Sequence, residues 1–399
     1  MSRIGCNSVS YGAFSRTLAL LLWLANAAVA SGQCPEVVSG LRQPLGIALS
    51  NQGHLIVSES GVRILPGTAI IPGRISIVDT SGNRRTLLEG LPSAINDVGE
   101  ASGPAGIFMR GRTIYVAIGV GDVTRFGGGP GLTIENPAGP SSPLFSSIIS
   151  IHFSANVENS TEGFTLTFAD QQALANGETV TLSNGDGDSI TIRLVANLPN
   201  FVPLTPPLIA ASNPFDLLAM EDHLYVTDGG RNLIWDIDLL TGSFSTLVSF
   251  PKLTNPLPIG PTLIDAVTTG IAAFGDELLV TNFTGFPFPN GASSVQQVDP
   301  ATGTFGAFIT GRRTAIDVLP ITDGENTDFL VLQHSSSQPM PFPPFAGAGQ
   351  VLRFDTPTDP PIIVASCLTR PTSMTLDEKA GTLYVSELAG RIVKIAIAP

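Results

Sequence analysis

Five of six regularly spaced positions of the chain carry side chains that could bind a cation or activate water; the sixth is Ile118. Each ends a repeated pattern in which an apolar run, a polar turn and a second apolar run follow one another. Three of the six residues are carboxylates and two are amides. Hard cations such as calcium take carboxylate and amide oxygens as ligands. The positions are Glu59, Ile118, Asp228, Asn282, Gln333 and Glu387.

This polar set allows three interpretations. The first is binding of calcium, our only candidate cofactor, by Glu59, Asp228, Asn282 and Glu387. The second is acid–base catalysis, or the holding of an activated water. The third is structural, because a water-filled channel needs polar walls and buried polar groups must find partners. In that case the carboxylates simply bond backbone amides of adjacent strands.

Two further residues should approach the same place. Asn213 begins the inner strand of the third repeat, and His334 directly follows Gln333. His334 could act as a general base near neutral pH, or it could be an ordinary hydrogen-bonded loop histidine.

Phenylalanines gather in loops next to these positions. The stretch 283–292, FTGFPFPNGA, carries Phe283, Phe286 and Phe288 among prolines and glycines. Similar long loops of other repeats carry Phe126, Phe145, Phe342 and Phe345. Loops on a rigid scaffold are where proteins usually place binding. The rings could pack on one another and close the end of a channel, or they could wall a pocket over a polar floor.

Six repeated units must position all of these residues. Each begins with a strand–turn–strand pattern, found at 46–59, 106–118, 216–228, 270–282, 317–333 and 373–387. A second hairpin follows most of them, so a unit is a four-stranded antiparallel sheet. Units of ~45 to 55 residues have the size of propeller blades. We predict an all-β, six-bladed β-propeller over residues 34–399, in which the N-terminal strand CPEVVSGL closes the last blade.

The second unit contains an insertion at residues 156–189. Its strand-like runs FTLTF and ETVTL predict an extra hairpin. The segment 183–189, SNGDGDS, resembles the start of a calcium loop but lacks the glycine and glutamate that complete one. Its Asn-Gly pair favours a tight turn instead.

The N-terminus has the features of a secretory signal peptide. Arg3 and Arg16 precede an apolar segment, residues 17–30, that ends in small residues at 28–30, so we predict cleavage after Ala30. This segment is too short to span a bilayer, and we expect no later span. The mature protein should therefore be secreted or periplasmic.

Two cysteines remain after this cleavage. Export permits a disulfide between Cys34 and Cys367. The repeat register places them on the outer strands of the sixth and fifth units, not obviously within the ~6 Å that a disulfide needs. A disulfide and two unpaired buried thiols both stay open.

Charge and motifs exclude several functions. The formal net charge is −13, and an acidic surface repels phosphate backbones, so we expect no nucleic-acid partner. The sequence contains no Walker loop, no HExxH, no GxSxG and no cysteine cluster with zinc spacing.

Three segments resemble the ScyD/ScyE family of exported propeller proteins. They are SNPFDLLAMEDHLYVTDGGRNLIWDID, LLVTNFTGFPFPNGASSVQQVDPATG and TLYVSELAGRIVKI. The resemblance covers residues 36–399 apart from the insertion. It implies a six-bladed, NHL-like propeller outside the cytoplasm and implies no particular activity. The chain departs from the family at Gly229 and at Gln333, where alanine and an acidic residue are usual, which weakens the transfer of a shared site.

We therefore expect an exported, monomeric, non-catalytic binding or accessory protein. Its ligand would be a small aromatic or apolar compound, a glycan or a protein, bound at the loop-rich end of the channel. A calcium-dependent hydrolase or lactonase of the gluconolactonase-like type is one alternative. Residues 44–46 count against it, because Pro-Leu-Gly stands where such proteins usually carry an acidic metal ligand. A cell-surface interaction scaffold is the other alternative, and whether the protein is an enzyme stays open.

Overall fold

The computed structural model describes residues 34–63, 70–129, 132–324, 326–337, 345 and 347–397. All of them belong to one compact unit, Ser31–Pro399. The predicted signal peptide and Phe342 lie outside the described residues.

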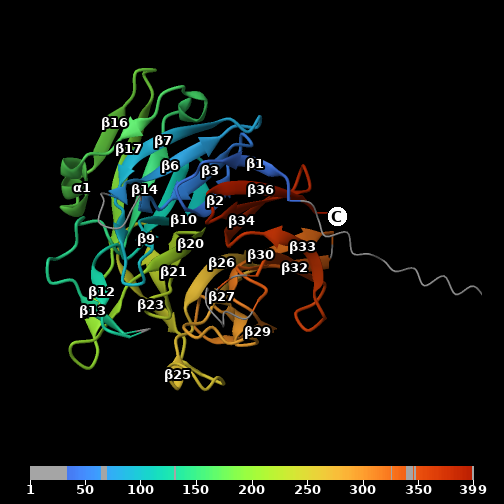
Figure 1. The fold of residues 1–399 in the computed structure, drawn as a ribbon. Coiled ribbons are helices and arrows are strands. Elements are labelled where there is room, and N and C mark those ends of the chain that lie inside the picture. Colours follow the sequence, from blue (N-terminus) through green and yellow to red (C-terminus); the bar gives the residue numbers. More distant parts are fainter. Residues whose placement is uncertain are drawn as a thin grey trace, which may run out of the picture. The chain divides into compact units, whose positions relative to one another are not determined.

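Six antiparallel sheets stand around a common axis as the blades of a propeller, as predicted (Figure 1). Blade one contains β2 (Pro44–Leu49), β3 (Leu55–Glu59), β6 (Gly73–Val78) and β7 (Arg84–Leu91). Blade two contains β10 (Pro104–Arg110), β11 (Thr113–Ile118), β14 (Ser147–Phe153) and β17 (Ser189–Asn197). Blade three contains β20 (Pro214–Met220), β21 (His223–Asp228), β22 (Leu233–Asp238) and β23 (Phe244–Ser249).

The remaining blades repeat this order from the axis outwards. Blade four contains β26 (Thr268–Phe274), β27 (Glu277–Asn282), β28 (Ser293–Val298) and β29 (Phe305–Arg312). Blade five contains β30 (Ala315–Asp323), β31 (Asn326–Gln333), β32 (Gly349–Phe354) and β33 (Ile362–Leu368). Blade six contains β34 (Pro371–Asp377), β35 (Thr382–Glu387), β36 (Arg391–Ala396) and, as its outer strand, β1 (Glu36–Ser39).

The hydrophobic core lies between the blades. The buried apolar residues form one cluster for each pair of neighbouring blades. Between blades two and three, for example, Ile148 packs with Leu224 and Val226. A sheet with two apolar faces cannot cover both alone, so the ring arrangement is what removes these faces from water.

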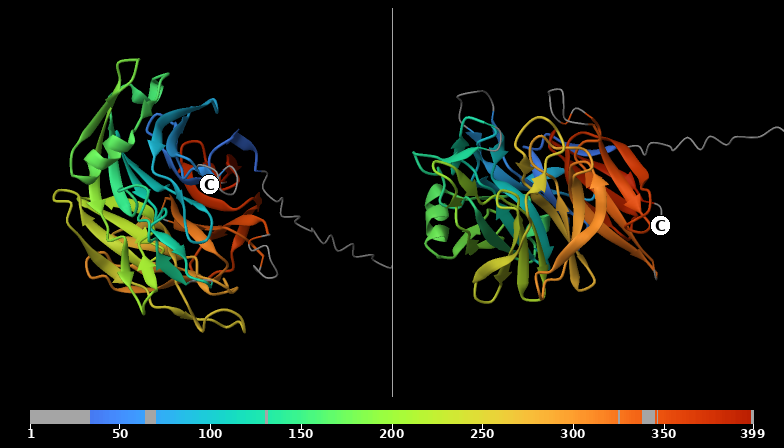
Figure 2. Two further views of the ribbon diagram at one scale, coloured as in Figure 1. Left: turned by 60° about the vertical axis from the view of Figure 1, so that its left-hand side comes forward. Right: turned by 90° about the horizontal axis from the view of Figure 1, so that it is seen from below.

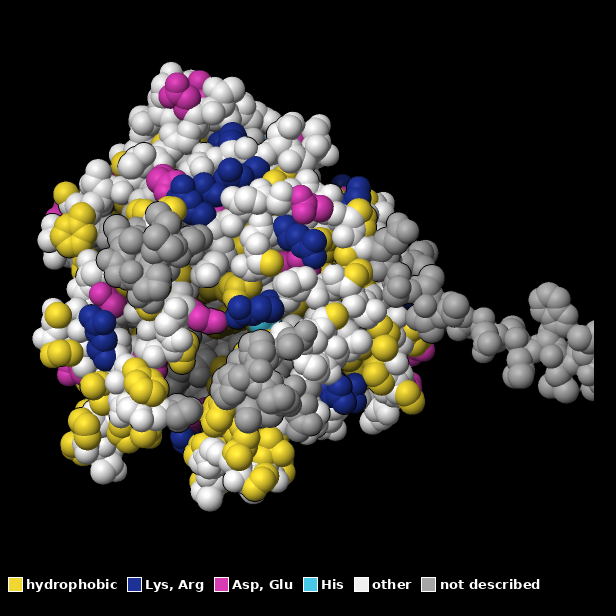
Figure 3. All heavy atoms as spheres, viewed as in Figure 1, with side chains coloured by type: hydrophobic (Ala, Val, Ile, Leu, Met, Phe, Trp, Pro, Cys, Tyr) yellow, Lys and Arg dark blue, Asp and Glu magenta, His cyan; other side chains and the backbone are white. Residues whose placement is uncertain are grey.

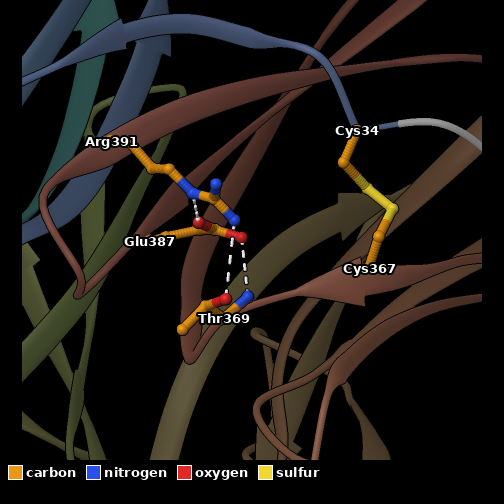
Figure 4. The surroundings of a disulfide bond; sticks show 5 residues. All are labelled: Cys34, Cys367, Thr369, Glu387 and Arg391. Carbon is orange, nitrogen blue, oxygen red and sulfur yellow. Dashed lines mark hydrogen bonds and ion pairs between the residues drawn. A yellow bond between two sulfur atoms is a disulfide. The ribbon is translucent and has the colours of Figure 1, made fainter.

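The ring is closed by the N-terminal strand and by a disulfide. Strand β1 pairs antiparallel with β36, as predicted. Cys34, just before β1, is bonded to Cys367 in β33, with a Cα–Cα distance of 6.1 Å (Figure 4). Of the two alternatives left open for these cysteines, the disulfide is the one present, because the outer strands of blades five and six approach each other at this point.

The insertion differs from the predicted free hairpin. Strand β16 (Val180–Ser183) does form a hairpin with β17 around the Asn-Gly turn. The run FTLTF, however, provides only β15 (Phe164–Thr165), which pairs in parallel with β7 of blade one. Helix α1 (Phe168–Ala175) follows, and Thr167 and Asp170 form a capping box at its start. The insertion thus joins blades one and two, and a short 3-10 helix, η1 (Val157–Asn159), begins it.

The calcium-like segment of the insertion is a hydrogen-bonded turn. Asp186 accepts hydrogen bonds from the hydroxyls of Ser160 and Thr161 and from the backbone of Glu162. These bonds, led by that of Ser160, lower the pKa of Asp186 to about 2. The carboxylate is thus already committed to organising the turn.

Within the described residues, no helix combines the length and the apolar character needed to cross a bilayer.

Candidate functional site

Long connections and small hairpins gather on one face of the propeller, which we call the loop face. Figure 2 shows these loops projecting from one side of the blades in its right-hand view. The pairs are β4 (Val62–Arg63) with β5 (Ile70–Ile71), β8 (Ala94–Ile95) with β9 (Ala101–Ser102), β12 (Thr124–Phe126) with β13 (Thr133–Glu135), β18 (Phe201–Pro203) with β19 (Ile209–Ala211), and β24 (Leu253–Thr254) with β25 (Leu263–Ile264). All lie in connections that leave or enter the strands at this face.

The six positions predicted from the repeat, five of them polar, do lie at this face. Each is the last residue of the second strand of its blade. The inner strand begins opposite it, as Pro44 does opposite Glu59 and Pro371 opposite Glu387. The repeat therefore placed the positions correctly, but their side chains do not form an open ring.

Glu59 is enclosed by its own blade. Its side chain is 0% exposed, and its carboxylate accepts hydrogen bonds from Arg74 Nε and Nη2, each at 2.8 Å. The hydroxyl of Ser76 and the backbone N–H of Arg42 complete the set. Arg42 lies just before the inner strand, so Glu59 fixes the segment that enters that strand.

Asp228 does the same in blade three. It accepts hydrogen bonds from the backbone N–H of Asn213 at 2.8 Å and from Trp235 Nε1 at 3.0 Å. Burial raises the pKa of this carboxyl, and the Asn213 and Trp235 hydrogen bonds oppose that rise. The side chain of Asn213 in turn accepts a hydrogen bond from the backbone of Val120 in blade two.

Glu387 and Gln333 repeat the arrangement. Glu387 accepts a hydrogen bond from the backbone N–H of Thr369 at 2.6 Å and pairs with Arg391 (Figure 4). Gln333 accepts one from the backbone N–H of Arg313 at 3.0 Å. In four blades, then, the polar residue holds the segment that leads into the inner strand, which is the structural interpretation of these positions.

Asn282 is the exception within this set. It is 3% exposed, and its Oδ1 accepts no hydrogen bond from a described residue. Among the described residues, no group of three or more His, Cys, Asp or Glu side chains is arranged to hold a metal ion. Calcium binding by Glu59, Asp228, Asn282 and Glu387 stays a prediction.

The phenylalanines of the loop 283–292 do come together, and they form an aromatic cluster with a loop of blade five. Phe288 packs edge-to-face on Phe345, with a centroid distance of 4.9 Å, and lies 6.0 Å from Phe283. Phe286 packs on Phe288 at 6.2 Å. All four rings are half-buried. We call Phe283, Phe286, Phe288 and Phe345 the aromatic cluster.

The other loop phenylalanines that the structure describes stand apart from this cluster. Phe126 is 59% exposed on β12, and Phe145 is fully buried in the core between blades one and two. The convergence predicted for all the loop phenylalanines is therefore correct only for blades four and five.

His334 lies beneath the aromatic cluster. Its ring packs against Phe345 at 5.1 Å and Phe283 at 5.7 Å between centroids. Its Nδ1 lies 2.8 Å from the carbonyl oxygen of Pro371, so that nitrogen carries the hydrogen. Burial lowers the pKa of His334 to about 4, which keeps the imidazole neutral at physiological pH.

An ion pair continues this arrangement across the loop face. Arg370 directs its Nε towards His334 Nε2 at 3.4 Å and pairs through Nη2 with Glu100 at 2.9 Å. Glu100 belongs to the β8–β9 hairpin, between blades one and two, whereas Arg370 lies just before β34, the first strand of blade six. Figure 3 shows basic and acidic side chains meeting near the middle of this face. Sequence reasoning missed both residues, because they lie in connections that the repeat does not describe.

The backbone around the aromatic cluster is strained. Thr284, Phe288 and Phe345 have φ values of +83°, +55° and +63°, a region that side chains other than glycine disfavour by about 1–2 kcal/mol. Such outliers persist only where the surroundings fix them, and they are often found at functional sites.

Exposed apolar side chains rim the loop face. Four of its small hairpins carry large apolar residues that are more than a third exposed. They are Val98, Phe126, Leu132, Leu204, Ile259 and Leu263. Figure 3 shows apolar side chains at the ends of projections on this face.

Comparisons with known proteins show resemblance at the level of the fold. A catalytically inactive variant of virginiamycin B lyase from Staphylococcus aureus, with quinupristin, is 12% identical, covers 92% of this chain and 99% of its own, and has a TM-score of 0.45. A gluconolactonase from Xanthomonas campestris is 11% identical over 92% of each chain, with a TM-score of 0.48. Such similarities carry no argument about activity. No known protein-family model matches the chain, and neither does any curated protein.

Proposed function

We propose that the protein is an exported binding protein without catalysis of its own, and that the aromatic cluster binds a flat, partly apolar ligand. The observation that carries this proposal is the half-buried cluster itself, which lies at the loop face above a neutral, buried histidine. Apolar pockets with a few polar groups are the usual form of a small-molecule site.

Pre-organisation supports the proposal. The rings hold one another edge-to-face, and backbone hydrogen bonds from residues 283–285 to residues 265–267 hold the start of the loop 283–292. A site that is already ordered loses little conformational entropy when its ligand binds. Aromatic side chains also carry much contact area on few rotatable bonds, so they make effective ligand contacts.

Export forms part of the proposal. The apolar N-terminal segment supports it, and so does the disulfide, because disulfides persist in oxidising compartments. Membership of the ScyD/ScyE family is likewise proposed, on the segments quoted above. The geometry lends less support to calcium-dependent hydrolysis, because Glu59, Asp228 and Glu387 are fully buried and hydrogen-bonded within their blades.

A tryptophan placed in the aromatic cluster tests the proposal. The mature protein would contain one tryptophan, Trp235, which is buried in blade three. In a Phe286→Trp variant, a panel of planar aromatic compounds should include members that saturably shift or quench the new fluorescence. A matched Leu240→Trp variant places an exposed tryptophan on the turn between β22 and β23 and should not respond. If every compound leaves the Phe286→Trp signal unchanged, or both variants respond alike, the proposal fails.

A further inference from the structure

A separate cavity occupies the central channel on the side away from the loop face. Its volume is about 300 Å³. All six inner strands line it, from Asp216 and Asp317 to the ends of the strands at Leu49, Met109 and Ala273. Ala273 is exposed, so this chamber opens at the face opposite the aromatic cluster.

Two aspartates form the polar end of the chamber, at equivalent positions of different blades. The third residue of each inner strand is, in blade order, Gly46, Gly106, Asp216, Gly270, Asp317 and Ser373. Each aspartate lies against the glycine of the preceding blade. A Cβ at Gly106 would lie 2.6 Å from Asp216 Oδ1, and one at Gly270 would lie 2.5 Å from Asp317 Oδ1. The glycines thus leave the space that the carboxylates occupy.

Both carboxylates accept hydrogen bonds from backbone N–H groups, and Asp317 also has a hydrogen bond with the Ser373 side chain. Asp216 accepts hydrogen bonds from Leu217 at 2.9 Å and from Ile271 of blade four at 3.2 Å. Asp317 accepts them from Val318 and from Met374 of blade six, each at 2.8 Å. No Lys, Arg or His among the described residues lines the chamber. The two acids therefore have no counter-charge there.

The energetic consequence is a pair of acids that resists full ionisation. Burial raises the pKa of Asp216 to about 7. Burial, with the charge of Asp216 as a further cause, raises the pKa of Asp317 well above its usual range. The strands packed around them contribute uncharged residues to the lining, and the charged residues Arg110, Asp323 and Asp377 end these strands outside it.

We propose that the chamber binds a small organic monocation, a primary ammonium group on a short aliphatic body, with the ammonium between Asp216 and Asp317. Apolar walls such as Ala48, Leu218 and Leu319 suit an aliphatic body. Directly bound calcium suits the chamber less, because it takes about six to eight oxygen ligands and two carboxylates supply fewer. The acidic net charge also favours a cation over an anion.

Binding should displace a proton from the acid pair. If one group with a pKa of about 7 must ionise, the affinity for the ammonium ion rises about tenfold between pH 6 and pH 8. We would titrate the mature protein with n-butylammonium chloride by calorimetry at both pH values, and with 1-butanol as the uncharged counterpart. We expect saturable binding of the ammonium ion, tighter at pH 8, proton release that depends on the buffer used, and no saturation by butanol.

Variants locate the site. The double substitution Asp216→Asn with Asp317→Asn should abolish butylammonium binding. The control Asp276→Asn removes a charge from the exposed turn between β26 and β27 on the same face, and should bind as the wild type does. Equal binding of butanol, an affinity independent of pH, or an equal loss in the Asp276→Asn control would each overturn the proposal. If the double variant does not fold, the wild-type titrations, at two pH values and with butylammonium against butanol, still test the proposal.

Discussion

At the scale of single residues, the polar side chains at the strand ends hold the backbone. Glu59, Asp228 and Glu387 each bond a backbone N–H of the segment entering the inner strand of their blade. A buried acceptor that satisfies several donors gives one fixed geometry, and losing it leaves those donors without partners. The repeated acidic residues, which from the sequence could also have been metal ligands, therefore have the same structural role in these three blades.

Glu59→Ala tests this role. Arg74 would be left buried without its partner, so we expect the free energy of unfolding to fall by about 3–5 kcal/mol. Glu89→Ala removes a half-exposed carboxylate of the same blade, paired with Arg42, and should cost less than about 1 kcal/mol. Urea unfolding measures both. Equal losses in the two variants would show that Glu59 does not hold the strand entry.

His334 predicts a pH dependence of stability. Its folded pKa of about 4 lies below the ordinary value of 6.5, so the unfolded chain takes up the proton first as the pH falls. The contribution is fully present above pH 6.5 and is lost progressively towards pH 4, by about 3 kcal/mol in total. His334→Asn should flatten this part of the stability curve, whereas His152→Asn, at an exposed site in β14, should not. An unchanged slope in His334→Asn would contradict the burial of a neutral imidazole.

At the scale of elements, the insertion is a brace between blades one and two. Leu174 of α1 is fully buried in the cluster between these blades, together with Phe164 and Leu166. The contribution of Leu174 to stability is testable, because the exposed Phe168 of the same helix provides a matched control.

Leu174→Ala should therefore lower the free energy of unfolding by about 2–5 kcal/mol, because it leaves a cavity in the core. Phe168→Ala should change it by less than about 0.5 kcal/mol, as most exposed positions do. Thermal and urea unfolding of the two variants give the comparison. If both variants lose equally little free energy of unfolding, the insertion does not brace the two blades.

The strands could be predicted from the sequence more completely than the side chains that they position. The repeat gives the six blades and the strand ends at Glu59, Asp228 and Glu387, because alternation and turn residues recur in every unit. It cannot give side-chain direction, which depends on partners such as Arg74 and Trp235 elsewhere in the blade. It also misses α1, because FTLTF alternates like a strand while Thr167 caps a helix. The pairing of Cys34 with Cys367 depends on how two outer strands approach, which no local pattern encodes.

At the scale of the whole molecule, two features close the ring of blades. Strand β1 completes blade six, and the disulfide joins residues 333 positions apart in the sequence. A crosslink over so long a loop removes much conformational freedom from the unfolded chain.

Replacing both cysteines by serine should thus lower the free energy of unfolding by about 2–5 kcal/mol. The wild type treated with a reductant should unfold like the double variant, and the reductant should leave the double variant unchanged. Scanning calorimetry provides the measurement. Equal midpoints for the oxidised wild type and the variant would mean that β1 closes the ring without the disulfide.

The central claim is that the aromatic cluster is the ligand-binding surface. Phe288 contacts the other three rings of the cluster, so it is the residue to remove. A planar aromatic compound that binds the wild type, titrated by calorimetry into a folded Phe288→Ala variant, should bind at least about tenfold more weakly, a loss of about 1.4 kcal/mol. Phe305→Ala, on the outer strand of the same blade, should keep the wild-type affinity. An unchanged affinity in Phe288→Ala, or no binding of any such compound to the wild type, would contradict the account.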